Sequence, residues 1–287
     1  MGAMTRVGSA LAGLVGSLRP RTRRTEPAGG TEGRPALPDT DADWRRIGET
    51  EPFWGVLTED RFRRERMDGD ARRAFYASGA QDIAFVLSRI QAMVPGFRPR
   101  RALDFGCGTG RLTLAMASHT GAVTGIDISP GMVTEARQAA AELGVGNAEF
   151  VNGSDHDGTG YDWINSCIVL QHIPPRRGYA ILRDLLSRLA PGGVCSIQLC
   201  FLRDAVHGGR LVGDGPFRSF DGEATPGGGE TDRHPTGTVM MYDYDLNRVF
   251  ATMLAEDIEL FGIAPTNHGG HHGAWLFGRR KEVAPAA

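Results

Sequence analysis

The sequence lacks the marks of a membrane protein and of a small domain stapled by disulfides. Its four cysteines stand in apolar or motif contexts and form no spaced framework. The longest apolar stretch near the N-terminus, residues 9–18, is interrupted by glycines and is about half as long as a membrane-spanning helix. We therefore predict a cytoplasmic protein with reduced thiols and no membrane segment.

An excess of positive charge is also missing. The chain has 32 basic and 34 acidic residues, a formal charge of −2. From residue 41 onward it carries 26 basic against 31 acidic residues, a formal charge of −5. Because polyanions are bound through clustered basic side chains, a net acidic body argues against a nucleic-acid substrate.

Apolar side chains are scarce at the start of the chain. Residues 1–40 contain no aromatic residue and no isoleucine, so we expect a disordered tail. Residues 41–95 read as a helical leader, because apolar side chains recur at helical spacing up to Pro95. We assign residues 96–281 to one domain, with a Gly-rich insertion at 203–237 and a short tail at 282–287.

Short apolar strands alternate with helical stretches through this domain. The predicted strands are residues 101–105, 122–127, 148–152, 163–167, 193–201, 258–264 and 273–279. This alternation is typical of a doubly wound α/β fold with a mainly parallel sheet. The last two strands are close enough along the chain to form a hairpin, with the segment 267–272 as its loop.

A glycine-rich turn follows the first strand. Gly106, Gly108 and Gly110 have the spacing G-x-G-x-G, and a helical stretch begins at Arg111. Glycine permits positive φ and lets a ligand approach the backbone without a Cβ in the way. Asp127 ends the second strand, where a carboxylate can accept hydrogen bonds from both hydroxyls of a ribose. The combination predicts a nucleoside cofactor.

The segments LDFGCGTGRLT, VTGIDISPGMV, VNGSDHD, INSCIVLQHI and LAPGG resemble the class I S-adenosylmethionine-dependent methyltransferases. The resemblance spans residues 75–279. It implies a Rossmann-like fold of seven strands with an antiparallel last strand and a helical N-terminal leader. It also implies S-adenosyl-L-methionine as the cofactor.

Site residues carry over from this resemblance segment by segment. The glycine turn would hold the methionine portion, the acid after the second strand the ribose, and the third strand's end the adenine. The fourth strand's end would lie beside the reactive methyl group, and the leader would cover the cofactor. The implied contacts are Tyr76, Asp104, Gly106, Cys107, Gly108, Gly110, Asp127, Ile128, Met132, Ser154, Asp155, His156 and Ser166.

Histidines supply the candidate bases, because the pKa of imidazole lies near neutrality. We select His172, after the fourth strand, and His271 and His272 in the hairpin loop, while His207 and His268 stay alternatives. The histidines of residues 268–272 could instead bind a metal ion, but no carboxylate or thiolate stands at ligand spacing. We predict no metal.

The predicted function is methylation of a small molecule on oxygen or nitrogen, with a sugar, a phenol or a secondary metabolite as acceptor. Three alternatives stay open: another reaction in the same cofactor pocket, an inactive cofactor-binding partner protein, and an NAD-dependent oxidoreductase. The glycine spacing disfavours the last, because dinucleotide binders use G-x-G-x-x-G. A homodimer is possible.

Overall fold

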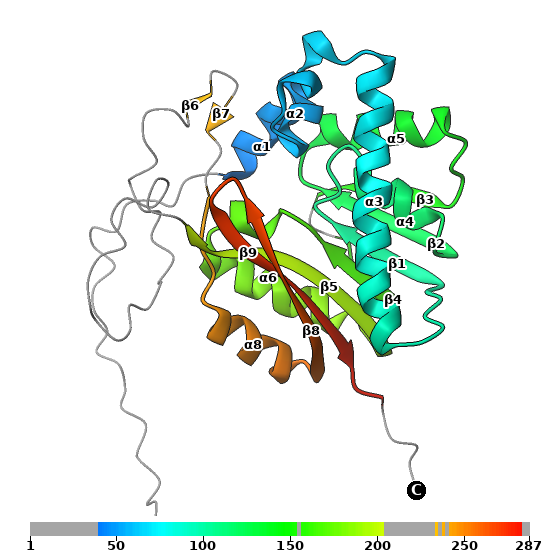
Figure 1. The fold of residues 1–287 in the computed structure, drawn as a ribbon, viewed down its shortest axis with the longest axis vertical. Coiled ribbons are helices and arrows are strands. Elements are labelled where there is room, and N and C mark those ends of the chain that lie inside the picture. Colours follow the sequence, from blue (N-terminus) through cyan, green and yellow to red (C-terminus); the bar gives the residue numbers. More distant parts are fainter. Residues whose placement is uncertain (1–39, 154–155, 204–232, 235–236, 239–240, 283–287) are drawn as a thin grey trace, which may run out of the picture. The chain divides into compact units, whose positions relative to one another are not determined.

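The computed structural model describes residues 40–153, 156–203, 233–234, 237–238 and 241–282. Residues 1–39 of the tail predicted at 1–40 and most of the Gly-rich segment lie outside these residues, while Thr40 begins the first helix. The described part contains one large sheet with helices on both faces (Figure 1). None of the described helices is long and apolar enough to span a membrane.

The large sheet has seven strands in the order β3-β2-β1-β4-β5-β9-β8. Strands β1 to β5 pair in parallel, and β9 is antiparallel to both of its neighbours, β5 and β8. This confirms the predicted fold. The bounds are β1 Arg101–Phe105, β2 Ala122–Asp127, β3 Ala148–Asn152, β4 Tyr161–Ser166, β5 Leu189–Arg203, β8 Ile258–His268 and β9 His271–Arg280. Outside this sheet, β6 Arg233–His234 pairs with β7 Gly237–Thr238.

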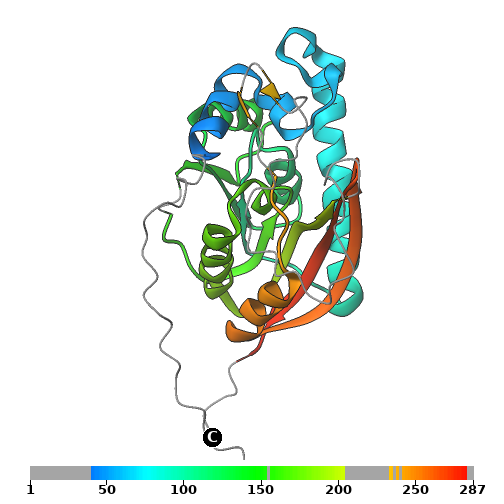
Figure 2. The same ribbon diagram turned by 90° about the vertical axis from the view of Figure 1, so that its left-hand side faces the viewer.

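Two hydrophobic clusters cover the opposite faces of the sheet. Successive residues of a strand point to opposite faces, so Ala102 joins one cluster and Leu103 the other. The Ala102 cluster includes α3 and α4, and the Leu103 cluster includes α6 and α8. Figure 2 shows these helices on either side of the sheet. Their bounds are α3 Gly69–Met93, α4 Arg111–Ala117, α5 Pro130–Glu142, α6 Pro175–Ser187 and α8 Leu246–Ala255.

The leader consists of several helices. Helices α1 (Thr40–Thr50) and α2 (Pro52–Val56) are followed by two 3₁₀ turns, η1 Asp60–Phe62 and η2 Arg64–Arg66, and by α3. The Asp68 carboxylate caps α3 by accepting a hydrogen bond from the Ala71 N–H at 2.8 Å. A third 3₁₀ turn, η3 Leu170–His172, follows β4.

The β8–β9 hairpin differs from its sequence prediction. The sequence predicts a loop over residues 267–272, but β8 runs through His268 and β9 begins at His271. Only Gly269 and Gly270 turn the chain, with φ of 63° and 97°. Two consecutive positive φ angles match the twist of a tight hairpin, so the ladder extends into the histidine run, which lacks an apolar strand pattern.

Candidate functional site

The glycine turn, residues 106–110, connects β1 to α4 as predicted. Gly106, Gly108 and Gly110 have φ of 74°, 54° and 82°. A Cβ on Gly106 would collide with the side chain of Val169, and one on Gly108 would lie 2.7 Å from a methyl of Val56. Glycine is therefore required here both by conformation and by close packing.

Asp127 ends β2 beside this turn. One oxygen of its carboxylate accepts a hydrogen bond from the Gly108 N–H at 2.8 Å, and the other accepts one from the Ser129 N–H at 2.9 Å. Burial raises the pKa of Asp127 to about 6, although these backbone bonds favour the charged form. The carboxylate is thus fixed by the backbone, and each oxygen keeps a lone pair for a ligand.

Asp104 is held by a chain of buried side chains. Its two oxygens accept hydrogen bonds from the Thr113 hydroxyl at 2.6 Å and the Asn165 amide at 2.9 Å. The Asn165 carbonyl accepts one from the Ser196 hydroxyl at 2.7 Å, and Ser196 accepts one from the Trp163 indole at 2.9 Å. The network joins α4, β1, β4 and β5, while burial raises the pKa of Asp104.

A cavity of about 170 Å³ lies over the carboxyl ends of these strands. It is lined by residues of the glycine turn, by the ends of β2 and β3, by the segment after β4, by α6 and by the leader. This is the position at which doubly wound sheets bind ligands. Eight of our candidates line it: Asp104, Gly106, Cys107, Gly108, Asp127, Ile128, Met132 and His172.

The remaining candidates lie elsewhere. Gly110 caps α4, and the Tyr76 hydroxyl donates to the carbonyl of Thr109 at 3.2 Å, so Tyr76 supports the turn from behind. Ser166 is buried at the end of β4, and its hydroxyl has no hydrogen-bond partner among the described residues. His156 pairs with the hydroxyl of Tyr161 at 2.5 Å. Ser154 and Asp155 lie outside the described residues.

The candidate bases lie in two different places, one at the cavity and two on the β8–β9 hairpin. His172 is buried in η3, lines the cavity and packs edge-on against Trp44 with ring centroids 4.8 Å apart. His271 and His272 pair with Arg203 and Leu202 across the sheet, and neither is among the described residues that line the cavity. No group of three metal-ligating side chains occurs in the described part of the chain.

The leader covers the cavity, and sequence reasoning missed the residues that do so. Thr40, Asp41 and Trp44 of α1 and Gly55 and Val56 of α2 line it. Asp41 forms a two-pronged ion pair with Arg177 of α6, at 2.6 and 2.8 Å. These contacts join segments that lie far apart in the sequence, so no local sequence pattern predicts them.

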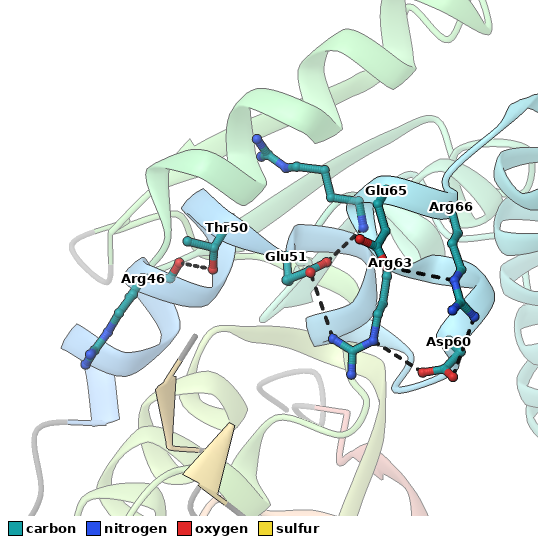
Figure 3. A network of polar contacts seen from close by, with 8 residues as sticks. Arg46, Thr50, Glu51, Asp60, Arg63, Glu65 and Arg66 are labelled. Carbon is teal, nitrogen blue, oxygen red and sulfur yellow. Dashed lines mark hydrogen bonds and ion pairs between the residues drawn. The ribbon is translucent and has the colours of Figure 1, made fainter. Parts of the chain in front are cut away.

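A polar network fixes the shape of the leader (Figure 3). The Glu51 carboxylate, just before α2, accepts a hydrogen bond from the Arg64 N–H at 2.8 Å and lies 3.9 Å from the Arg63 guanidinium. Arg63 and Arg66 both pair with Asp60, at 3.2 and 3.7 Å. The network ties α2 to the 3₁₀ turns behind it and so holds Val56 against Gly108.

The cavity's residues fit a nucleoside cofactor with an amino-acid end. Asp127 presents a carboxylate to a ribose, and the glycine turn offers backbone with no Cβ in the way. Buried polar residues also line the cavity, among them Asp104 and Arg111. Burial raises the pKa of Cys107, so its thiol stays neutral. All four cysteines are free.

Solved structures match this architecture. Magnesium protoporphyrin IX methyltransferase from Synechocystis PCC 6803, with bound SAH, aligns with a TM-score of 0.58 and 20% identity. The alignment covers 85% of this chain and 100% of the Synechocystis protein. A Burkholderia thailandensis 1,6-didemethyltoxoflavin-N1-methyltransferase aligns with a TM-score of 0.53 and 18% identity. This alignment covers 88% of this chain and 93% of the Burkholderia protein. The described part of the chain therefore has the Rossmann-like fold of class I methyltransferases.

Sequence comparisons find methyltransferases as well. Residues 102–193 match the model of a family described as methyltransferase domain. A trans-aconitate 2-methyltransferase of Methylobacterium radiotolerans is 33% identical over 39% of this chain and 42% of its own length. A 23S rRNA (uracil(747)-C(5))-methyltransferase of Vibrio vulnificus is 30% identical over 51% of this chain and 39% of its own length. The matched part of the chain is therefore similar to S-adenosylmethionine-dependent methyltransferases, and it spans less than half the length of these two relatives.

Proposed function

We propose that the protein transfers a methyl group from S-adenosylmethionine to an oxygen or nitrogen atom of a small molecule. The observation that carries the proposal is the Asp127 carboxylate, held by the Gly108 and Ser129 amides at the edge of the cavity. It supplies the acceptor that a ribose requires, directly beside a glycine turn. The cofactor would supply an activated methyl group whose leaving group is already good.

Two observations favour a small acceptor such as a sugar, a phenol or a secondary metabolite. The body of the chain has a formal charge of −5, which repels a polyanion. The cavity is also lined by residues of α1 and α2, and its volume of about 170 Å³ suits a small ligand. The relative named for trans-aconitate acts on a small molecule, whereas the one named for rRNA represents the competing acceptor class. A cytoplasmic location and a homodimer stay predictions.

The chain's own contribution would be positioning and proton removal. Methyl transfer requires a nucleophile held in line with the breaking bond, and positioning can supply most of the acceleration. We assign the proton acceptor to His172, because it lines the cavity and Trp44 fixes its ring edge-on. His271 and His272 are the alternatives.

The test is transfer of a labelled methyl group from S-adenosylmethionine into pooled hydroxylated, phenolic and amine-bearing small molecules, with total RNA in parallel. We expect label in a small-molecule pool. His172→Ala should lower kcat about a hundredfold, as loss of a general base does, while affinity for S-adenosylhomocysteine stays unchanged. His119→Ala, on an exposed turn after α4, is the matched control.

Three results would contradict the proposal. Label in RNA would make nucleic acid the acceptor. Binding of S-adenosylmethionine without transfer to any pool would favour another reaction or an inactive partner protein. Loss of turnover in His271→Ala or His272→Ala, with His172→Ala active, would move the base to the hairpin.

A further inference from the structure

The turn that carries His172 needs support from outside itself. η3 is a 3₁₀ turn of three residues. Within it, the His172 N–H donates to the Val169 carbonyl at 2.9 Å, and the Ile173 N–H donates to the Leu170 carbonyl at 2.8 Å. The hydrogen bonds of a 3₁₀ turn are weaker than those of an α-helix, and so short a helix is not stable alone. The groups that fix this turn therefore also fix His172 in the cavity wall.

The chain enters the turn through a strained residue. Ile168 has a φ of 58°, in the left-handed region that β-branched residues rarely adopt. Its N–H donates to Oε1 of the buried Gln198 at 2.9 Å. A strained conformation of this kind persists only where the surroundings enforce it. The segment between β4 and α6 is thus held in one conformation by contacts with other elements.

Tyr244 spans the turn from one end to the other. Its hydroxyl lies 2.8 Å from the carbonyl oxygen of Leu170 and 2.8 Å from that of Ile173, so both oxygens share its proton. Leu170 is the first residue of η3, and Ile173 follows its last. Tyr244 is 1% exposed, and burial raises the pKa of Tyr244, so the hydroxyl stays a donor at neutral pH.

The backbone around Tyr244 connects the turn to the sheet. The Tyr244 N–H donates to the carbonyl of Cys200 in β5 at 2.9 Å, and the Tyr242 N–H donates to the carbonyl of Gln171 in η3 at 2.7 Å. Both tyrosines are buried. Because β5 lies inside the large sheet, these bonds hold η3 relative to the strands that form the floor of the cavity.

Helix α6 leaves room for the Tyr244 hydroxyl. A Cβ added to Gly178 would collide with that oxygen, and the neighbouring Tyr179 packs edge-on against the Tyr244 ring with centroids 5.3 Å apart. Glycine inside a helix is unfavourable relative to alanine. The close approach of Tyr244 to η3 gives Gly178 a structural reason.

We propose that Tyr244 is a positioning residue for methyl transfer, which holds η3 so that His172 faces the acceptor. The proposal rests on the proposed function, because it takes His172 as the proton acceptor. It assigns the segment before α8 to the acceptor side of the reaction, whereas the glycine turn and Asp127 belong to the cofactor side.

The first experiment measures transfer of labelled methyl into the small-molecule pool that accepts it, with saturating S-adenosylmethionine. Tyr244→Phe keeps the ring and removes the hydroxyl. We expect turnover to fall about tenfold, within the hundredfold that a misplacement of 1 Å can cost, while affinity for S-adenosylhomocysteine stays within about twofold. Tyr242→Phe is the matched control, because the Tyr242 hydroxyl has no hydrogen-bond partner among the described residues and the variant keeps the backbone N–H.

A double-mutant cycle separates positioning of His172 from a general structural role. If Tyr244 acts through His172, then Tyr244→Phe should change turnover by less than about twofold when His172→Ala is already present. An equal fall with and without His172 would overturn the proposal, and so would wild-type turnover in Tyr244→Phe. If Tyr244→Phe does not fold in a thermal melt, Gly178→Ala decides by the same comparison, because its methyl displaces the hydroxyl from η3.

A second experiment needs no acceptor and no activity. The NMR signal of the His172 ring, assigned by its loss in His172→Ala, reports the position of the ring beside Trp44. Tyr244→Phe should shift this signal and Tyr242→Phe should not, because both variants keep their aromatic rings. An unchanged signal in Tyr244→Phe would overturn the proposal even if no pool accepts label. Absence of label in every pool, with the signal shifted as expected, would instead remove the proposed function and leave Tyr244 as the residue that places His172.

Discussion

The glycine turn and the β8–β9 hairpin turn both lie at the carboxyl edge of the sheet, but they are built differently. At the glycine turn, each neighbouring carboxylate accepts two defined hydrogen bonds, and side chains crowd the glycines. At the hairpin, a Cβ added to Gly269 would meet nothing within 4 Å, and Asn267 is exposed. A pre-organised cofactor site needs the first construction, whereas a surface turn tolerates change.

The largest contrast is expected between Asp104 and Asn267. Asp104→Ala leaves two buried donors, Thr113 and Asn165, without their acceptor, and we expect it to lower the free energy of unfolding by about 3 kcal/mol. Asn267→Ala removes one part-buried bond, which the exposed Asn267 side chain accepts from the Gly270 N–H at 2.7 Å, and should cost about 1 kcal/mol. Urea unfolding of both variants measures this contrast, and equal losses would break it.

A smaller contrast is expected between two glycines with similar backbone angles. Gly106 and Gly269 have φ of 74° and 63°, so alanine strains the backbone at both by about 1–2 kcal/mol. At Gly106 the new methyl also meets Val169, which should add about 1–3 kcal/mol of overpacking. Thermal melts should therefore show the greater loss for Gly106→Ala. Val169→Ala in the same chain should restore part of it.

The smallest contrast concerns how stability depends on pH. The effect of acidification has opposite signs for Asp127 beside the glycine turn and for His268 at the hairpin. Burial raises the pKa of Asp127 to about 6, so the folded state holds this proton more tightly than the unfolded state. Its contribution to stability therefore increases as pH falls from 7 to 5, by about 1 kcal/mol. Desolvation lowers the pKa of His268, so its contribution decreases as pH falls below its unfolded pKa.

Unfolding free energies at pH 7 and pH 5 separate these two terms. Asp127→Asn should remove the gain on acidification, and His268→Asn should remove the loss. The same protonation should weaken cofactor binding at pH 5, because a protonated Asp127 has one fewer charged acceptor for the ribose. A pH profile unchanged in Asp127→Asn would show that Asp127 does not titrate in this range.

The contrast also explains what could be predicted from the sequence. The glycine turn and Asp127 are specified locally, because spacing along one strand and one turn fixes where backbone and carboxylate meet. Residues such as Val56, Asp41 and Trp44 act through contacts between distant segments, so no pattern near them shows their place. The prediction of a loop for the histidine run is wrong, because polar side chains conceal a strand that the ladder with β5 and β8 stabilises.

Calorimetric titration of S-adenosylhomocysteine into the wild-type protein, Asp127→Asn and Asp184→Asn tests the central claim most directly. Asp184 also lines the cavity, but its carboxylate pairs with Arg188 at 2.7 Å. We predict micromolar binding by the wild type, a loss of about 10- to 100-fold in Asp127→Asn, and little change in Asp184→Asn. Equal binding by all three proteins, or tighter binding of NAD by the wild type, would contradict the account.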